Sequence, residues 1–167
     1  MLRLFGGALI FIVLAYCGFY FAERLKKHRD FLRSVSGALA FTATEIEFGH
    51  SELEQVLRRA DTSPALCGFF TVCADEIKNL GIRKAWSNAV NAFEERMMLS
   101  SCEKDTLLQL GNQLGMSDVD GQRNAISRTV HQLDEYADLA DREYVRLAKP
   151  YRSCGILLGV FVLIIIA

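Results

Sequence analysis

Two apolar runs without a charged residue flank the sequence, one from Leu4 to Ala22 and one from Ser153 to Ala167. Nineteen residues in an α-helix cover about 28 Å, which is close to the roughly 30 Å of a bilayer's hydrocarbon core. The second run covers only about 22 Å, and a helix that starts near Lys149 lengthens it. We therefore expect two transmembrane helices, at residues 1–22 and 153–167, and one domain between them at residues 23–152.

A secretory signal is the rival interpretation of the first run, because Arg3 precedes it and residues 14–17 resemble a lipoprotein cleavage box. Tyr16 is too large for the cleavage position. The apolar run also continues past Cys17, whereas the apolar region of a signal covers about 7 to 15 residues. These departures favour a membrane anchor over a cleaved signal.

Lys and Arg side chains gather beside the predicted spans, on the side of the central domain. Five follow the first span: Arg24, Lys26, Lys27, Arg29 and Arg33. Four precede the second span: Arg142, Arg146, Lys149 and Arg152. Only Arg3 lies on the other side, so the positive-inside rule predicts a cytoplasmic domain with both termini outside the cell membrane.

Two long helical patterns frame the central domain. Leucines 25, 32 and 39 recur every seven residues and predict that the first span continues as a helix to about Phe48. From Ser117 to Pro150, apolar residues alternate spacings of four and three, as in a coiled-coil seam. We expect the two helices to pair as an antiparallel stalk, with Pro150 bending the second one.

Four shorter helices are predicted between these two. Three of them have start signals, which are Ser51 with Glu54, Ser63 with Pro64, and Ser100 with Glu103. The remaining helix is predicted from the apolar stripe that runs from Trp86 to Met97. Gly81 and Gly115 are the predicted stops, and no run alternates as a strand does. The predicted fold class is therefore all-α: a six-helix antiparallel bundle with a long two-helix stalk that continues into two terminal transmembrane helices.

Gly155 and Gly159 form a GxxxG pattern in the second apolar run. Such a pair lets another helix backbone approach closely, and the first span is the expected partner. The alternative is that both glycines merely face lipid.

Motifs that carry chemistry are missing from the sequence. It contains no GxxxxGK[ST] for phosphates, no HExxH for zinc, no GxSxG nucleophile and no glycine-rich dinucleotide turn. The three histidines are scattered, and the formal charge of -1 does not favour nucleic acid. We expect no catalytic residue, no cofactor, no metal and no small-molecule substrate, and we expect that the protein is not an enzyme.

Two acidic groups are candidates for binding. Asp134, Asp138 and Asp141 share one helix face; a solvated face is favoured there over a cation site or a docking face. The second group is a candidate partner-binding site, although helix capping and surface solvation account for some of its members. Its residues are Glu45, Glu47, Glu52 and Glu54.

One string of residues is more specific than any of these patterns. Residues 110–118, Leu-Gly-Asn-Gln-Leu-Gly-Met-Ser-Asp, resemble the LGxxLGxSD motif of the stage III sporulation protein AB family. Residues 44–49, the Trp86 region and residues 151–155 resemble the same family, over essentially the whole chain. Pro150 departs from the family pattern, where a helix-compatible residue is expected.

The resemblance implies a non-enzymatic membrane component of the channel-like apparatus between mother cell and forespore in endospore-forming bacteria. It places the protein in the mother-cell membrane around the forespore. The family's domain is similar to the F domain of type II secretion, a six-helix platform beside a hexameric ATPase. The expected partners are therefore other proteins of the channel complex, in particular a cytoplasmic ATPase; the sequence does not reveal the oligomeric state.

Two functions of other classes are the alternatives to this one. An enzyme whose active site forms only on assembly would bring titratable residues together in an apolar pocket. A small receptor would need a ligand-binding part outside the membrane, and the predicted outside segments are too short for one.

Overall fold

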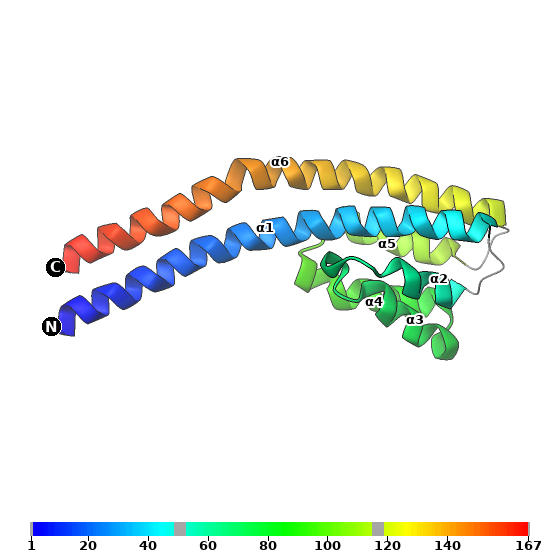
Figure 1. The fold of residues 1–167 in the computed structure, drawn as a ribbon, viewed down its shortest axis with the longest axis horizontal. Helices are drawn as coiled ribbons and strands as arrows, with labels where there is room; N and C mark the ends of the chain where they lie inside the picture. Colours follow the sequence, from blue (N-terminus) through cyan, green and yellow to red (C-terminus); the bar gives the residue numbers. More distant parts are fainter. Residues whose placement is uncertain (1, 49–52, 115–118, 167) are drawn as a thin grey trace. The chain divides into compact units, whose positions relative to one another are not determined.

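The computed structural model describes residues 2–48, 53–114 and 119–166, and every regular element within these ranges is helical (Figure 1). Six α-helices follow one another: α1 (Leu2–Phe48), α2 (Leu53–Ala60), α3 (Phe69–Leu80), α4 (Ile82–Met97), α5 (Ser101–Gln113) and α6 (Val119–Ile166). A 3-10 turn, η1 (Pro64–Leu66), lies between α2 and α3. The prediction of an all-α fold with six helices is confirmed.

The chain divides into two compact units. Unit 1 comprises Met1–Arg29 and Leu139–Ala167, and unit 2 comprises Asp30–Asp138. Unit 1 thus contains the first part of α1 and the last part of α6. Unit 2 contains the remainder of both helices together with α2 to α5.

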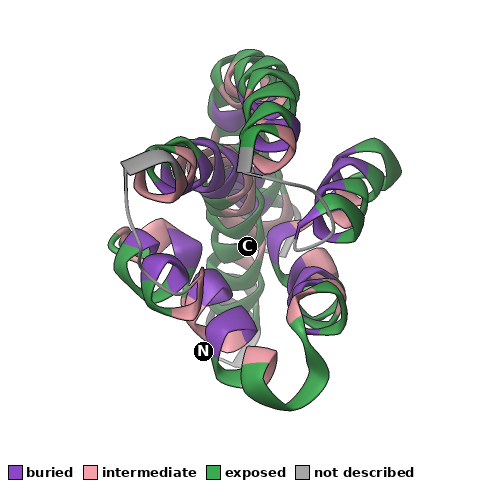
Figure 2. Ribbon diagram, turned by 90° about the vertical axis from the view of Figure 1, so that its right-hand side faces the viewer, coloured by how far each residue is buried: buried purple, intermediate pink, exposed green. Residues whose placement is uncertain are grey.

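An aromatic cluster forms the centre of unit 2. The Phe69 ring lies edge-on to the rings of Phe31, Phe70, Trp86 and Phe93, with centroids 5.1 to 5.7 Å apart. Edge-to-face packing at this separation is favourable beyond the area it buries. In Figure 2 the helices of unit 2 turn buried residues toward one another and exposed residues outward.

Trp86 ties α4 to α5. Its indole Nε1 donates a hydrogen bond of 2.7 Å to the Leu107 carbonyl, which satisfies the one polar atom of a fully buried ring. Gly111, one turn further along α5, lies so close to the ring that a Cβ there would overlap the Trp86 side chain. The predicted stripe from Trp86 to Met97 is confirmed as the buried face of α4.

The predicted capping box at the start of α5 is also confirmed. The Ser100 side chain accepts from the Glu103 backbone N–H at 3.4 Å, and the Glu103 carboxylate accepts from the Ser100 backbone N–H at 2.7 Å. Two backbone donors without a partner in the helix are thereby satisfied. Glu103 is buried as a result of this role.

The predicted start of the third helix at Ser63 and Pro64 is wrong. Ser63 caps only the short turn η1, where its side chain accepts from the Ala65 backbone N–H at 3.3 Å. Cys67 and Gly68 then adopt left-handed conformations, with φ of 52° and 84°, so the helix cannot continue and α3 begins at Phe69. Gly68 tolerates this backbone because it has no Cβ.

The two long helices extend beyond the range of their stripes. α1 is helical up to Phe48, the last residue described before the gap at residues 49–52, and α6 continues through Pro150 to Ile166. The predicted signals at Ser51, Gly115 and Ser117 lie outside the described residues.

No helix, over the residues that the structure describes, is both long and apolar enough to cross a membrane. The prediction of two terminal transmembrane helices is therefore not supported.

We expect Gly111→Ala to destabilise unit 2 by about 1–3 kcal/mol, because the added methyl group would displace the Trp86 ring. Gly37→Ala is the matched control, since nothing lies within 4 Å of a Cβ at that helical position. The control should stabilise the protein by up to about 1 kcal/mol. Urea unfolding followed by the fluorescence of Trp86, the only tryptophan, measures both; equal midpoints for the two variants would contradict the close packing.

Candidate partner-binding site

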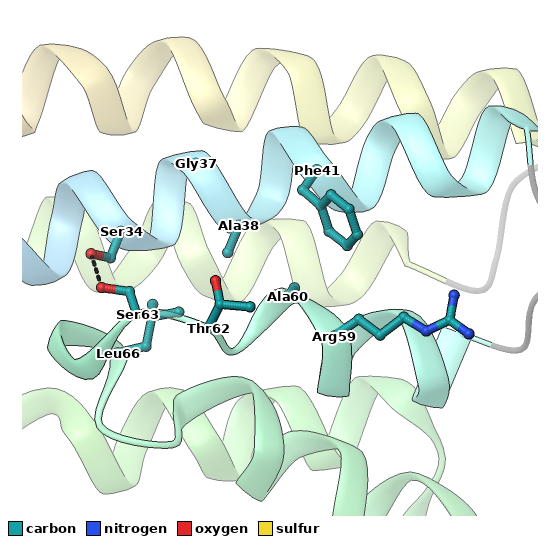
Figure 3. Close-up of a pocket in the computed structure, with 9 residues that line it drawn as sticks. All are labelled: Ser34, Gly37, Ala38, Phe41, Arg59, Ala60, Thr62, Ser63 and Leu66. Carbon is teal, nitrogen blue, oxygen red and sulfur yellow. Dashed lines mark hydrogen bonds between the residues drawn. The ribbon is translucent and has the colours of Figure 1, made fainter.

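A groove runs along unit 2 between α1 and the segment formed by α2 and η1 (Figure 3). Its volume is about 490 Å³, within the range that holds a ligand or a group of partner side chains. It is lined by Ser34, Gly37, Ala38, Phe41, Arg59, Ala60, Thr62, Ser63 and Leu66.

Small residues on both sides create this groove. Gly37 and Ala38 on α1 face Ala60 at the end of α2, so the two elements leave room between their backbones. The Phe41 ring stands at one side and is 41% exposed, while Leu66 is fully buried. The groove therefore offers an apolar surface that a partner side chain can cover.

Polar groups mark two places along the groove. The hydroxyls of Ser34 and Ser63 are hydrogen-bonded at 2.9 Å, which joins α1 to η1. The Arg59 guanidinium lies at the other place and pairs with Glu45 at 3.6 Å, yet its side chain remains 60% exposed. The groove can accordingly bury an apolar side chain and donate hydrogen bonds to an acidic or carbonyl group.

Two of the four predicted partner-binding carboxylates are held in ion pairs. Glu45 contacts Arg59, whereas Glu54 contacts Lys78 at 3.1 Å and Arg58 at 3.3 Å. The side chain of Glu47, and Glu52 entirely, lie outside the described residues. The structure thus brings Glu45 to the edge of the groove and Glu54 to the junction of α2 and α3, and partner binding by this group stays a prediction.

The surroundings of Glu54 shift its pKa. The hydrogen bond from Lys78 lowers the pKa of the carboxyl below its usual value of 4.5, and the charges of Lys78 and Arg58 act in the same direction. Arg58 also donates a 2.6 Å hydrogen bond to Asp75 on α3, and its own pKa is raised. The contacts of Glu54 with Lys78 and of Arg58 with Asp75 join α2 to α3.

The predicted acidic face on α6 contacts α1. In unit 2, Ser36 donates a 2.5 Å hydrogen bond to Asp134, and Arg33 lies 3.9 Å from Asp138. In unit 1, Arg29 pairs with Asp141 at 3.1 Å. The interpretation of these three aspartates as a solvated face did not include their contacts with α1. Such contacts depend on how α1 and α6 are aligned, which the sequence of each helix alone does not show. Among the described residues, no group of three His, Cys, Asp or Glu could hold a metal ion.

The glycines of the GxxxG pattern lie against α1 within unit 1. A Cβ on Gly155 would come within 2.8 Å of the Leu14 carbonyl oxygen and 3.2 Å of the Gly18 Cα. A Cβ on Gly159 would lie 2.6 Å from the Phe11 ring. Gly18 was missed as a packing residue, because its position opposite Gly155 depends on the register between two segments far apart in sequence.

Large apolar side chains remain exposed along both helices of unit 1. Those on α1 are Leu9, Ile10, Ile12, Val13, Tyr16, Phe19, Tyr20 and Phe21. Those on α6 are Leu139, Val145, Tyr151, Ile156, Leu157, Leu158, Val160, Phe161 and Ile164. An apolar surface of this kind is typical of a site that contacts a membrane or another protein.

The fold and these surfaces define an all-helical protein with an apolar helical pair, a buried aromatic core and one described groove. The family model of stage III sporulation protein AB matches residues 3–167, so the chain belongs to that family. Stage III sporulation protein AB of Bacillus subtilis (strain 168) is 22% identical over 170 residues, and the match covers 99% of each chain. No solved structure matches.

We expect Glu54→Gln to remove part of the acid sensitivity of unit 2. Because the folded pKa of Glu54 lies below 4.5, its ion pairs stabilise the fold above that pH, and this contribution is lost as the pH falls through the folded pKa. Thermal midpoints measured across this range should therefore fall less steeply in the variant. Glu135→Gln, an exposed carboxylate that pairs with no described residue, is the control, and identical pH profiles for both variants would contradict this role of Glu54.

Proposed function

We propose that this sporulation protein is a non-enzymatic, membrane-associated platform component of the secretion-like apparatus between mother cell and forespore. The observation that carries the proposal is the contrast between its two units: unit 1 leaves large apolar side chains exposed along both of its helices, whereas the described residues of unit 2 expose only Phe41 and Leu80 and form a groove. The membership of the family supplies the role in sporulation.

Association with a membrane accounts for the surface of unit 1. Leaving this many aliphatic and aromatic side chains in water is unfavourable, at roughly 25 cal/mol per Å² of apolar surface. A bilayer covers such a surface without requiring shape complementarity. The aromatic rings of Tyr20, Phe21 and Tyr151, next to a series of cations, suit the boundary between lipid and water.

Docking of a cytoplasmic partner is the role proposed for unit 2. The groove holds three hydroxyls and one guanidinium around an apolar surface, a composition suited to binding rather than to acid–base catalysis. The similarity of the family's domain to the F domain of secretion systems makes the ATPase of the same apparatus the proposed partner.

Filling the groove tests this docking role. Gly37 lines the groove and a Cβ there meets no atom within 4 Å, so Gly37→Trp would add an indole at the groove without displacing a neighbouring side chain. We expect the variant to fold normally and to capture at least tenfold less of the ATPase in a pull-down from mild detergent. Ala40→Trp, an exposed position of α1 that does not line the groove, is the matched control. Equal capture by both variants would exclude the groove as the docking site.

The sidedness of unit 2 is tested by its own thiols. Cys67 and Cys102 are exposed, whereas burial raises the pKa of the Cys73 thiol to about 12 and leaves it protonated and unreactive. With Cys17 and Cys154 replaced by Ser, we expect a membrane-impermeant maleimide to label Cys67 and Cys102 only after the cells are permeabilised. Labelling in intact cells would contradict the proposed cytoplasmic location.

A further inference from the structure

Charge is divided unequally between the two units. Unit 1 contains nine Lys or Arg and three Asp or Glu, a net charge of +6, whereas unit 2 contains ten and seventeen, a net charge of -7. The formal charge of -1 for the chain conceals this separation. A net positive unit with an exposed apolar surface has the two features that bind a negatively charged membrane.

Four cations lie along one face of α6 in unit 1. Arg142, Arg146, Lys149 and Arg152 follow at spacings of four, three and three, which places them on a single stripe of the helix. None of the four pairs with a carboxylate of the described residues, in contrast to Arg29 and to Arg58. We call these four residues the basic stripe.

Within unit 1, α1 and α6 are aligned so that the position where each helix changes from apolar to charged residues lies beside that of the other. The Phe21 ring stacks on the Tyr151 ring at 5.8 Å, and the Gly18 and Gly155 backbones touch one turn away. Phe21 is the last exposed apolar residue of α1 before the group of cations that starts at Arg24. On α6, Tyr151 directly precedes Arg152, the last cation of the basic stripe, and the uncharged segment follows.

Packing holds Arg152 at this boundary. Its guanidinium carbon lies 5.7 Å from the centre of the Phe19 ring, and its Nε is buried without a hydrogen-bond partner among the described residues. A buried donor without an acceptor is unfavourable, and the planar guanidinium matches a phosphate group. The arrangement therefore presents a fixed cation, with unused donors, next to an apolar surface.

We propose that the basic stripe binds the phosphate groups of anionic phospholipids, with Arg152 and Lys149 at the level of the headgroups. The inference rests on the proposed membrane association and names its ligand. Lipid is favoured over an acidic protein surface because the stripe is followed on α6 by an uncharged segment with a dense series of exposed apolar residues, from Ile156 to Ile164, as at a bilayer boundary.

The spacing of the stripe predicts a graded effect. Lys149 and Arg152 lie about 4.5 Å apart along the helix axis, within a headgroup layer of about 5 to 8 Å. Arg142 lies about 15 Å from Arg152, which exceeds the Debye length of about 8 Å at physiological salt. Removing Arg152 or Lys149 should therefore weaken the preference for anionic lipid more than removing Arg142.

Flotation of the full chain with vesicles tests the proposal. One set of vesicles is phosphatidylcholine alone, and the other contains equal parts of phosphatidylcholine and phosphatidylglycerol. We expect the protein to partition preferentially into the second set, and Arg152→Gln or Lys149→Gln to reduce this preference by about fivefold each. Lys84→Gln, an exposed lysine of unit 2, is the matched control and should leave it unchanged.

Arg152→Lys tests whether the guanidinium group or only its positive charge is required, because lysine keeps the charge and lacks the planar group with its paired donors. An intermediate loss of preference supports a phosphate held by Arg152. Trp86 fluorescence verifies that each variant is folded.

Equal partitioning of the wild-type chain into both sets of vesicles would overturn the inference and leave membrane association standing. Absence from both sets would contradict membrane association itself. An effect of Arg142→Gln as large as that of Arg152→Gln would overturn the proposed level of the headgroups, as would a preference that only an acidic protein, and not phosphatidylglycerol, can compete away.

Discussion

Contact between α1 and α6 is the interaction on which each unit depends, because neither long helix can cover its apolar stripe alone. In unit 2 this contact carries specific polar pairs, with Ser36 on Asp134 and Arg33 near Asp138. In unit 1 the helices approach until the backbones of Gly18 and Gly155 touch. Small residues permit the close backbone contact in unit 1. The matched polar groups set the alignment of the two helices in unit 2.

Periodicity and capping signals in the sequence predict most of the fold. The helix count, the buried stripe of α4 and the capping box of Ser100 and Glu103 depend on local chemistry, and the described residues have all of them. The start of α3 was predicted incorrectly because Cys67 adopts a left-handed backbone. A cysteine rarely does so, and nothing in its sequence neighbourhood indicates it.

The candidate site was much less predictable, because it depends on which residues of distant segments face one another. Nothing in the sequence marks Gly37, Ala38 and Ala60 as binding residues, because they line a groove only when α2 lies beside α1. The acidic residues are visible as a cluster, and Arg58 lies one turn after Glu54 on α2, but the pairs of Glu45 with Arg59 and of Glu54 with Lys78 join different helices. The sequence shows which residues are charged, whereas the ion pairs between helices depend on how those helices are aligned.

The two units also differ in whether their charged side chains are paired. Several charged side chains of unit 2 are paired within it, as in the contacts of Glu54 with Lys78 and of Lys104 with Glu94. Such pairs reduce the field that a partner would sense and mainly join neighbouring helices. Among the described residues, no carboxylate pairs with the basic stripe of unit 1, so its field is not reduced in this way, and the same unit exposes apolar side chains. An unpaired row of cations next to an apolar surface costs free energy in isolation, and a negatively charged lipid surface removes both costs at once.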